Sequence, residues 1–193
     1  MSRPVGVLAL QGDFAAHQAL LEAAGHSTRQ VRNPDDLDGI GGLLLPGGES
    51  TTISMGIERE GLREPIQQLA QSGVPIFGTC AGLVLMGREH LGLIEMAVDR
   101  NAFGRQIFSF EADLSMASLG DPPVRAVFIR APIVTEVGEG VEVLAELDGA
   151  IVAVRQGPCT AISFHPELVN DARMHLLALG LGAGSAEPSP AQT

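Results

Sequence analysis

The first half of the chain alternates between short apolar runs and segments in which apolar residues recur with helical spacing. Continuous apolar runs are typical of strands that are buried on both faces of a parallel sheet. They predict strands at residues 5–10, 42–45 and 74–77, with a weaker signal at 29–32. Helical spacing predicts helices at residues 14–24, 51–56, 65–72 and 81–88. This alternation predicts a three-layer α/β fold, with a mostly parallel central sheet and helices on both faces.

The second half changes to additional, antiparallel strands joined by short turns, expected at residues 95–98, 109–114, 124–129, 141–146, 151–155 and 160–164. Asp148-Gly149 lies between two of these runs and is a hairpin signal. A last helix is expected at 172–181, capped by Asn170 or Asp171. We therefore expect one domain over residues 1–182. Residues 183–193 cannot build a core, and we expect them to be disordered.

Cys80 lies where an expected strand meets an expected helix, between Gly78 and Gly82. This order is typical of a nucleophile elbow, in which a tight turn exposes the side chain and the helix N-terminus favours thiolate. Far along the chain, His165 and Glu167 are two residues apart, so in an extended stretch they would point the same way. A single cysteine is more often a buried apolar residue. The three together indicate a Cys-His-Glu triad.

The other cysteine and histidines lack this context. Cys159 follows no strand–turn–helix pattern, and we interpret it as structural. His17 and His175 lie in helical patterns, and His26 and His90 lie near helix ends; none has an acid two residues on. No further Cys, His, Asp or Glu cluster completes a metal site around His165 and Glu167, so we expect no metal.

The net charge of the chain limits the classes of partner that we expect it to bind. The 193 residues carry a net charge of -11, which argues against nucleic acid and anionic membranes, because both require a basic surface. Two cysteines make no disulfide framework, and neither a signal peptide nor a membrane-spanning stretch is visible. We therefore expect a cytoplasmic protein.

Three loops follow the expected parallel strands, at Gln11-Gly12, at residues 46–50 and at residues 78–80. Ligands of open α/β sheets bind at the carboxyl ends of the strands, so these loops predict the catalytic face. The glycine-rich loop 46–52 is compatible with a phosphate cradle, an oxyanion hole or an ordinary turn with a serine cap. It lacks the Gly-Lys-Ser/Thr ending of a P-loop. Opposite Cys80 we favour an oxyanion hole made by backbone N–H groups of Gly48 and Ala81.

Arginines also lie in expected loops, at positions 100, 105 and 130. An arginine there could bind a substrate carboxylate bidentately. It could equally form a surface salt bridge of little energetic value. The residues alone leave these alternatives open.

Seven motifs together resemble one family, the glutaminase subunit of pyridoxal 5′-phosphate synthase, within the class I (triad) glutamine amidotransferases. The motifs are Leu10-Gln-Gly12, Leu45-Pro-Gly-Gly-Glu-Ser-Thr-Thr52, Phe77-Gly-Thr-Cys-Ala-Gly82, Arg100-Asn-Ala-Phe-Gly-Arg-Gln106, Ser109-Phe-Glu-Ala-Asp113, Phe128-Ile-Arg-Ala-Pro132 and Ser163-Phe-His-Pro-Glu-Leu168. Residues 78–82 with His-Pro-Glu indicate a triad amidotransferase in general. The motifs at residues 45–52 and 100–106 point to the glutaminase subunit of pyridoxal 5′-phosphate synthase specifically.

The resemblance implies hydrolysis of L-glutamine, with ammonia passed to a partner synthase subunit that makes pyridoxal 5′-phosphate from a pentose phosphate and a triose phosphate. It implies that Cys80 is the nucleophile, His165 the general base and acid, and Glu167 the residue that orients the imidazole. No cofactor is implied. The implied glutamine contacts are Gly48, Glu49, Ser50, Arg105, Ile129 and Arg130. Gln11 and Gly12 would lie near the oxyanion hole and the partner interface.

Other functions remain open beside this one. Another amidotransferase subunit would use the same chemistry for a different acceptor. A silent regulatory module would have no need of all three triad residues, and a small peptidase or glyoxalase-like protein would place its histidine directly after the cysteine. The chain departs from the family at residues 89–92, where its loop is shorter. That departure affects the local surface and leaves the site motifs intact.

Overall fold

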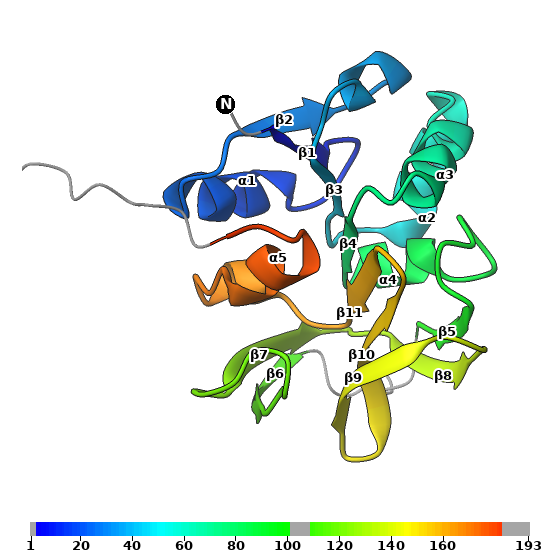
Figure 1. The fold of residues 1–193 in the computed structure, drawn as a ribbon. Helices are drawn as coiled ribbons and strands as arrows, with labels where there is room; N and C mark the ends of the chain where they lie inside the picture. Colours follow the sequence, from blue (N-terminus) through cyan, green and yellow to red (C-terminus); the bar gives the residue numbers. More distant parts are fainter. Residues whose placement is uncertain (1–2, 101–108, 183–193) are drawn as a thin grey trace, which may run out of the picture.

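The computed structural model describes residues 3–100 and 109–182. Within those residues a nine-stranded sheet runs through the molecule in the order β2-β1-β3-β4-β11-β10-β8-β5, with β9 paired to β10 (Figure 1). A separate two-stranded sheet consists of β6 (Ser109–Leu114) and β7 (Val124–Ile129). The architecture is thus the mixed α/β fold that the sequence predicts.

One half of the large sheet is parallel. Its strands are β1 (Val5–Leu8), β2 (Thr28–Val31), β3 (Gly42–Leu45), β4 (Ile76–Thr79) and β11 (Cys159–Ile162). Every residue of β1, β3, β4 and β11 is buried, which explains why those strands read as short apolar runs. The carboxyl ends of all five strands lie at one edge of the sheet.

Helices cover both faces of this parallel half (Figure 1). On one face lie α1 (Phe14–Ala23) and α5 (Arg173–Ala178), and on the other lie α2 (Ser50–Arg59), α3 (Arg63–Gln71) and α4 (Ala81–Met86). Helix α2 is longer than expected at both ends, and α4 ends two residues early because Gly87 leaves the helical conformation. Helix α5 is shorter than the expected 172–181, and its N-cap is Ala172, which makes no side-chain capping bond. Asp171, one residue earlier, accepts a hydrogen bond from the Arg173 N–H.

The other half of the sheet is antiparallel and centres on β10 (Ala150–Gln156), which pairs with β11, β9 (Glu142–Leu147) and β8 (Ile133–Val137). Strand β8 also pairs with β5 (Met96–Asp99). The predicted hairpin is confirmed, since Asp148 and Gly149 both have positive φ, 51° and 80°. Strand β8 was not predicted, because only one of its five residues is buried and it shows no alternation.

Two apolar cores lie on opposite faces of the sheet. One joins the sheet to α2, α3 and α4, for example through Ile53, Ile66 and Leu83. The other joins it to α1, α5 and the β6–β7 sheet. In this second core Phe128 stacks on Phe110 and meets Phe164 edge-on, which anchors the segment leading into His165. None of the helices in residues 3–100 and 109–182 combines the length and apolar character needed to cross a bilayer.

Candidate active site

Cys80 lies on the tight turn between β4 and α4, with φ 50° and ψ -102°. This left-handed conformation is rare for a residue other than glycine and is typical of strained, functional turns. Its N–H donates to the Ile162 carbonyl at 2.8 Å, which ties the turn to β11. A Cβ at Gly82 would lie 2.1 Å from the Leu45 carbonyl oxygen, so only glycine lets α4 start this close to β3. The turn has the geometry of a nucleophile elbow.

His165 and Glu167 come together differently from the sequence-based expectation. The expected strand to residue 164 ends at Ile162, and Pro166–Leu168 form a 3₁₀ turn, so the stretch is not extended. The turn nevertheless brings Nδ1 of His165 within 2.6 Å of Oε1 of Glu167. The His165 N–H donates to the Val127 carbonyl at 2.9 Å, which fixes the backbone beneath the imidazole.

The electrostatics of His165 follow from its two neighbours. Burial alone lowers the pKa of the imidazole, but hydrogen bonding with Cys80 and Glu167 and the charges of both groups outweigh it, raising the pKa to about 10. A protonated imidazole at this position can donate a proton to a leaving group beside Cys80. Cys159 contrasts with this, because burial in β11 raises the pKa of its thiol to about 11. That environment agrees with a structural role for Cys159.

The glycine-rich loop after β3 packs directly against the triad. A Cβ at Gly47 would lie 2.7 Å from Cε1 of His165 and 3.6 Å from Cβ of Cys80. The loop that follows β1 also holds this glycine-rich loop, because Oε1 of Gln11 accepts a hydrogen bond from the Glu49 N–H at 2.8 Å. A Cβ at Gly12 would lie 1.9 Å from the Gly47 carbonyl oxygen, so at this point the two loops meet backbone against backbone.

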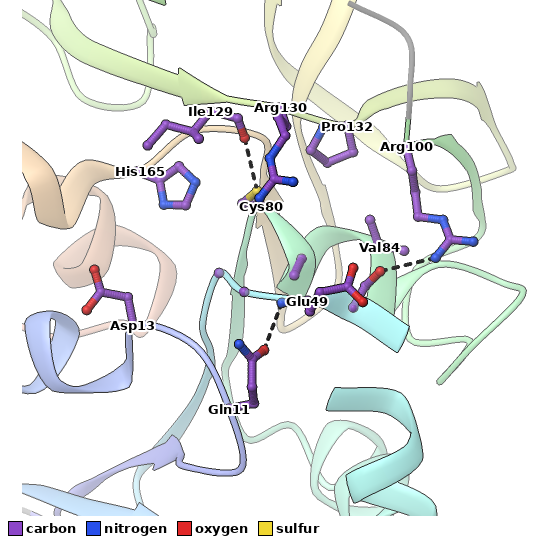
Figure 2. A pocket seen from close by; sticks show the side chains of 14 residues that line it. Gln11, Asp13, Glu49, Cys80, Val84, Arg100, Ile129, Arg130, Pro132 and His165 are labelled. Carbon is purple, nitrogen blue, oxygen red and sulfur yellow. Dashed lines mark hydrogen bonds between the residues drawn. The ribbon is translucent and has the colours of Figure 1, made fainter. Parts of the chain in front are cut away.

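A cavity of about 520 Å³ opens above Cys80 (Figure 2). Nine of the residues singled out from the sequence line it: Gln11, Gly48, Glu49, Ser50, Cys80, Ala81, Ile129, Arg130 and His165. The other five lining residues are Asp13, Gly47, Val84, Arg100 and Pro132. Gly47 belongs to the loop expected at the catalytic face and Arg100 to the arginines considered for a carboxylate, whereas Asp13, Val84 and Pro132 had been given no role. Glu167 lies behind His165, away from the opening. Arg105 lies outside the described residues.

Arg100 makes the clearest contacts of these five residues. Its guanidinium donates to Oγ of Ser50 at 3.2 Å and to Oγ1 of Thr51 at 3.4 Å, so it reaches the start of α2 across the cavity (Figure 2). The sequence places arginines at positions 100 and 105, and nothing in it distinguishes which one faces the cavity. Within the described part of the chain, Arg100 and Arg130 are the arginines that line this cavity.

His17 is a functional neighbour that sequence reasoning missed. It was set aside because no acid follows it two residues later, yet the fold brings its Nε2 to 3.5 Å from Oε2 of Glu167. The one available signal was its position on the apolar face of α1, where His17 is buried together with Leu20 and Leu21. Across residues 3–100 and 109–182, no group of three His, Cys, Asp or Glu side chains is arranged to hold a metal ion.

Comparisons with known proteins agree with this geometry. Residues 7–179 match the SNO glutamine amidotransferase family. The chain is 54% identical over 178 residues to the pyridoxal 5′-phosphate synthase subunit PdxT of Pelotomaculum thermopropionicum, covering 89% of this chain and 91% of the relative. It is 53% identical over 188 residues to the PdxT subunit of Herpetosiphon aurantiacus, covering 92% and 99%.

Solved structures show the same likeness. The crystal structure of a glutamine amidotransferase that is 44% identical superposes with a TM-score of 0.86, covering 92% of this chain and 99% of the other. A chain of the Thermotoga maritima PurLQS structure, only 19% identical, superposes with a TM-score of 0.74 over 93% and 99% and shares the fold. The chain therefore belongs to the SNO glutamine amidotransferase family.

Proposed function

We propose that this chain is the glutaminase subunit of a pyridoxal 5′-phosphate synthase, hydrolysing L-glutamine and supplying ammonia to a partner synthase subunit. The observation that carries the proposal is that Cys80 and His165 line a cavity of about 520 Å³ while Glu167 is hydrogen-bonded to Nδ1 of the imidazole. Family membership and the PdxT relatives, about half identical over nine-tenths of the chain, support a pyridoxal 5′-phosphate synthase subunit as the acceptor of the ammonia. Both cysteines are free and buried, which fits a cytoplasmic location.

The chemistry follows from these three residues. The Cys80 thiolate attacks the side-chain carbonyl carbon of glutamine and forms a tetrahedral intermediate. His165 gives its Nε2 proton to the departing nitrogen, so ammonia leaves and a glutamyl thioester remains. His165 then removes a proton from water, which attacks the thioester and releases glutamate. Glu167 holds the imidazole by Nδ1 in both half-reactions and stabilises its positive charge.

The cavity offers complementary groups for the rest of the substrate. Arg100 and Arg130 can receive the α-carboxylate of glutamine, and the Glu49 carboxylate can receive its α-ammonium group. Gly48, Ser50 and Ile129 line the same wall, and Arg105 remains a candidate on the resemblance alone. We assign the developing oxyanion to the backbone N–H groups of Gly48 and Ala81, which line the cavity beside Cys80.

Gln11 and Gly12 provide the proposed link to the partner. The side chain of Gln11 holds the Glu49 N–H, and Gly12 touches Gly47, so displacement of this loop reaches the residues beside Cys80. A partner subunit that binds here would therefore adjust the glycine loop and gate hydrolysis. Such gating prevents ammonia from being lost to bulk water before an acceptor is present.

Nitrogen transfer tests this function. The chain and a synthase subunit are supplied with amide-¹⁵N glutamine, a pentose phosphate, a triose phosphate and excess unlabelled ammonium. We expect glutamate release and pyridoxal 5′-phosphate that carries ¹⁵N despite the unlabelled ammonium in solution. Glutamate release with unlabelled product would overturn direct ammonia delivery to this partner. No glutamate release by folded protein would overturn the glutaminase assignment.

A further inference from the structure

Behind the triad, on the side away from the cavity, two buried imidazoles extend the line of polar contacts into the core. Nε2 of His17 lies 3.5 Å from Oε2 of Glu167 and 3.2 Å from Oγ1 of Thr79. Nδ1 of His17 lies 2.8 Å from Nε2 of His175, which comes from α5. His17, Thr79 and His175 are fully buried, and so is the side chain of Glu167. Such a connected set is unusual in a core that is otherwise apolar.

Both imidazoles are neutral in the folded protein. Burial, together with the neighbouring His175 and His165, lowers the pKa of His17 well below its ordinary value. Burial also lowers the pKa of His175, to about 4, against a smaller opposing effect of Asp171. Each ring therefore carries one N–H and one lone pair, and the short contact between them requires one to donate.

The surroundings determine the direction of that hydrogen bond. If His17 donated from Nδ1, its Nε2 lone pair would face the Glu167 carboxylate, and His175 would bury an Nδ1–H. Among the described residues, Nδ1 of His175 has no hydrogen-bond partner, so a proton there would be an unsatisfied buried donor. In the opposite direction His175 donates from Nε2 to Nδ1 of His17. Nε2 of His17 then carries a proton that points toward Oε2 of Glu167 and Oγ1 of Thr79.

Oε2 of Glu167 needs such a neighbour. Oε1 is occupied by His165, whereas Oε2 is buried and has no hydrogen-bond partner in residues 3–100 and 109–182. At 3.5 Å the His17 contact is longer than a hydrogen bond, but a neutral N–H beside a buried carboxylate oxygen is electrostatically favourable where water is excluded. A neutral donor also leaves the negative charge of Glu167 available to His165, whereas a cation would compete for it.

We propose that His17 is a positioning residue of the triad, whose neutral Nε2–H holds Oε2 of Glu167 so that Oε1 stays on His165. This inference rests on the proposed glutaminase function for its kinetic consequence. His175 sets the tautomer of His17. The Nε2 proton of His17 is shared between Oε2 of Glu167 and Oγ1 of Thr79. The alternative is that His17 merely fills space in the core, in which case its replacement changes stability and leaves turnover by the folded enzyme unchanged.

Two carboxamide variants distinguish these alternatives. In His17→Gln the amide nitrogen can reach the position of Nε2, whereas in His17→Asn the shorter amide reaches only the position of Nδ1. With the synthase subunit present, we expect His17→Asn to lower kcat by about 10- to 100-fold with KM changed less than about twofold, as for groups that orient a functional residue. His17→Gln should stay within about threefold of wild type. Equal kcat values for the two variants would overturn the proposal.

Two controls show whether the effect passes through Glu167. Leu21→Ala removes apolar packing from the same face of α1 and should lower thermal stability without changing kcat of the folded enzyme. In a Glu167→Gln background, His17→Asn should lower kcat by no more than about twofold further, because the group it positions is already altered. A full loss in that background would show that His17 acts elsewhere.

One measurement depends on neither variants nor activity. ¹⁵N-histidine NMR of the wild-type chain reports which nitrogen of each buried imidazole is protonated. We expect protonated Nε2 and unprotonated Nδ1 for His17, and protonated Nε2 for His175. Protonated Nδ1 in His17 would overturn the proposal whether or not the protein hydrolyses glutamine. Failure of glutaminase activity with the expected tautomers would instead count against the proposed function alone.

Discussion

At the scale of single residues, the site depends on glycines, because the lack of a side chain lets the backbone approach the catalytic residues closely. Gly47 lies beside the imidazole of His165, and Gly82 lies against the backbone of β3. Cys80 is held in a left-handed conformation between them. The reactive groups are therefore positioned by close backbone contacts, which leave little room for a side chain.

Gly47→Ala tests this close packing. Its Cβ would lie 2.7 Å from Cε1 of His165, so the imidazole or the loop must move. We expect kcat/KM for glutamine to fall by at least about tenfold, since small displacements of catalytic groups have large effects on rate. Gly182→Ala adds the same methyl group in open space and should leave the rate unchanged. Wild-type kcat/KM in Gly47→Ala would show that the imidazole tolerates displacement.

At the scale of elements, the strand-to-helix connections bring the site together. The loops after β1, β3 and β4 and the turn after β11 converge at one edge of the sheet. Apolar runs and glycine positions were enough to predict β1, β3 and β4, because buried parallel strands have little freedom in composition. Strand β11 was expected among the antiparallel strands, but it pairs parallel with β4. The hairpin at Asp148 was predicted for a similar reason, since its turn requires positive φ.

Features that depend on distant contacts could not be predicted from local pattern. Strand β8 is mostly exposed, so its pairing with β5 and β10 leaves no alternation to detect. The 3₁₀ turn at Pro166 replaces the extended stretch that His165 and Glu167 suggested. His17 reaches Glu167 only because α1 packs near that turn, from a position 150 residues earlier in the chain.

Gln11→Ala tests the connection between the loops after β1 and β3. The change removes the acceptor of the Glu49 N–H, which releases the loop that we assign to substrate binding. We expect KM for glutamine to rise several-fold, with little loss of stability because the freed N–H can bind water. Gln68→Ala, on an exposed position of α3, serves as the control. An unchanged KM would mean that the Gln11 side chain does not hold this wall.

At the scale of the whole molecule, the buried histidines predict how stability depends on pH. His17 and His175 have lowered pKa values, so below about pH 6.5 the unfolded chain binds protons that the folded chain does not. Each histidine lowers the free energy of unfolding by up to about 1.4 kcal/mol for every pH unit below its ordinary pKa. His165 has a raised pKa, so its stabilisation is complete below pH 6.5 and is lost as pH rises toward about 10.

We therefore expect thermal stability to be greatest near pH 6.5 and to fall on both sides. The chain contains neither Trp nor Tyr, so circular dichroism is the suitable probe of unfolding. His165→Gln should flatten the decline between pH 6.5 and about 9, below the range in which the buried Cys159 thiol contributes, and leave the acid side unchanged. A stability that rises steadily from pH 6.5 to 10 in the wild type would contradict the charge state assigned to His165.

The central claim is that Cys80 is the nucleophile of a glutaminase, and glutamate release from L-glutamine tests it most directly. Wild type, Cys80→Ala and Cys159→Ala are assayed with the synthase subunit present, after circular dichroism has shown each to be folded. We predict that Cys80→Ala loses at least about a thousandfold in rate, as expected when a covalent nucleophile is removed. Cys159→Ala should remain within about twofold of wild type, since its thiol is buried in β11. Wild-type glutamate release by Cys80→Ala would contradict the account.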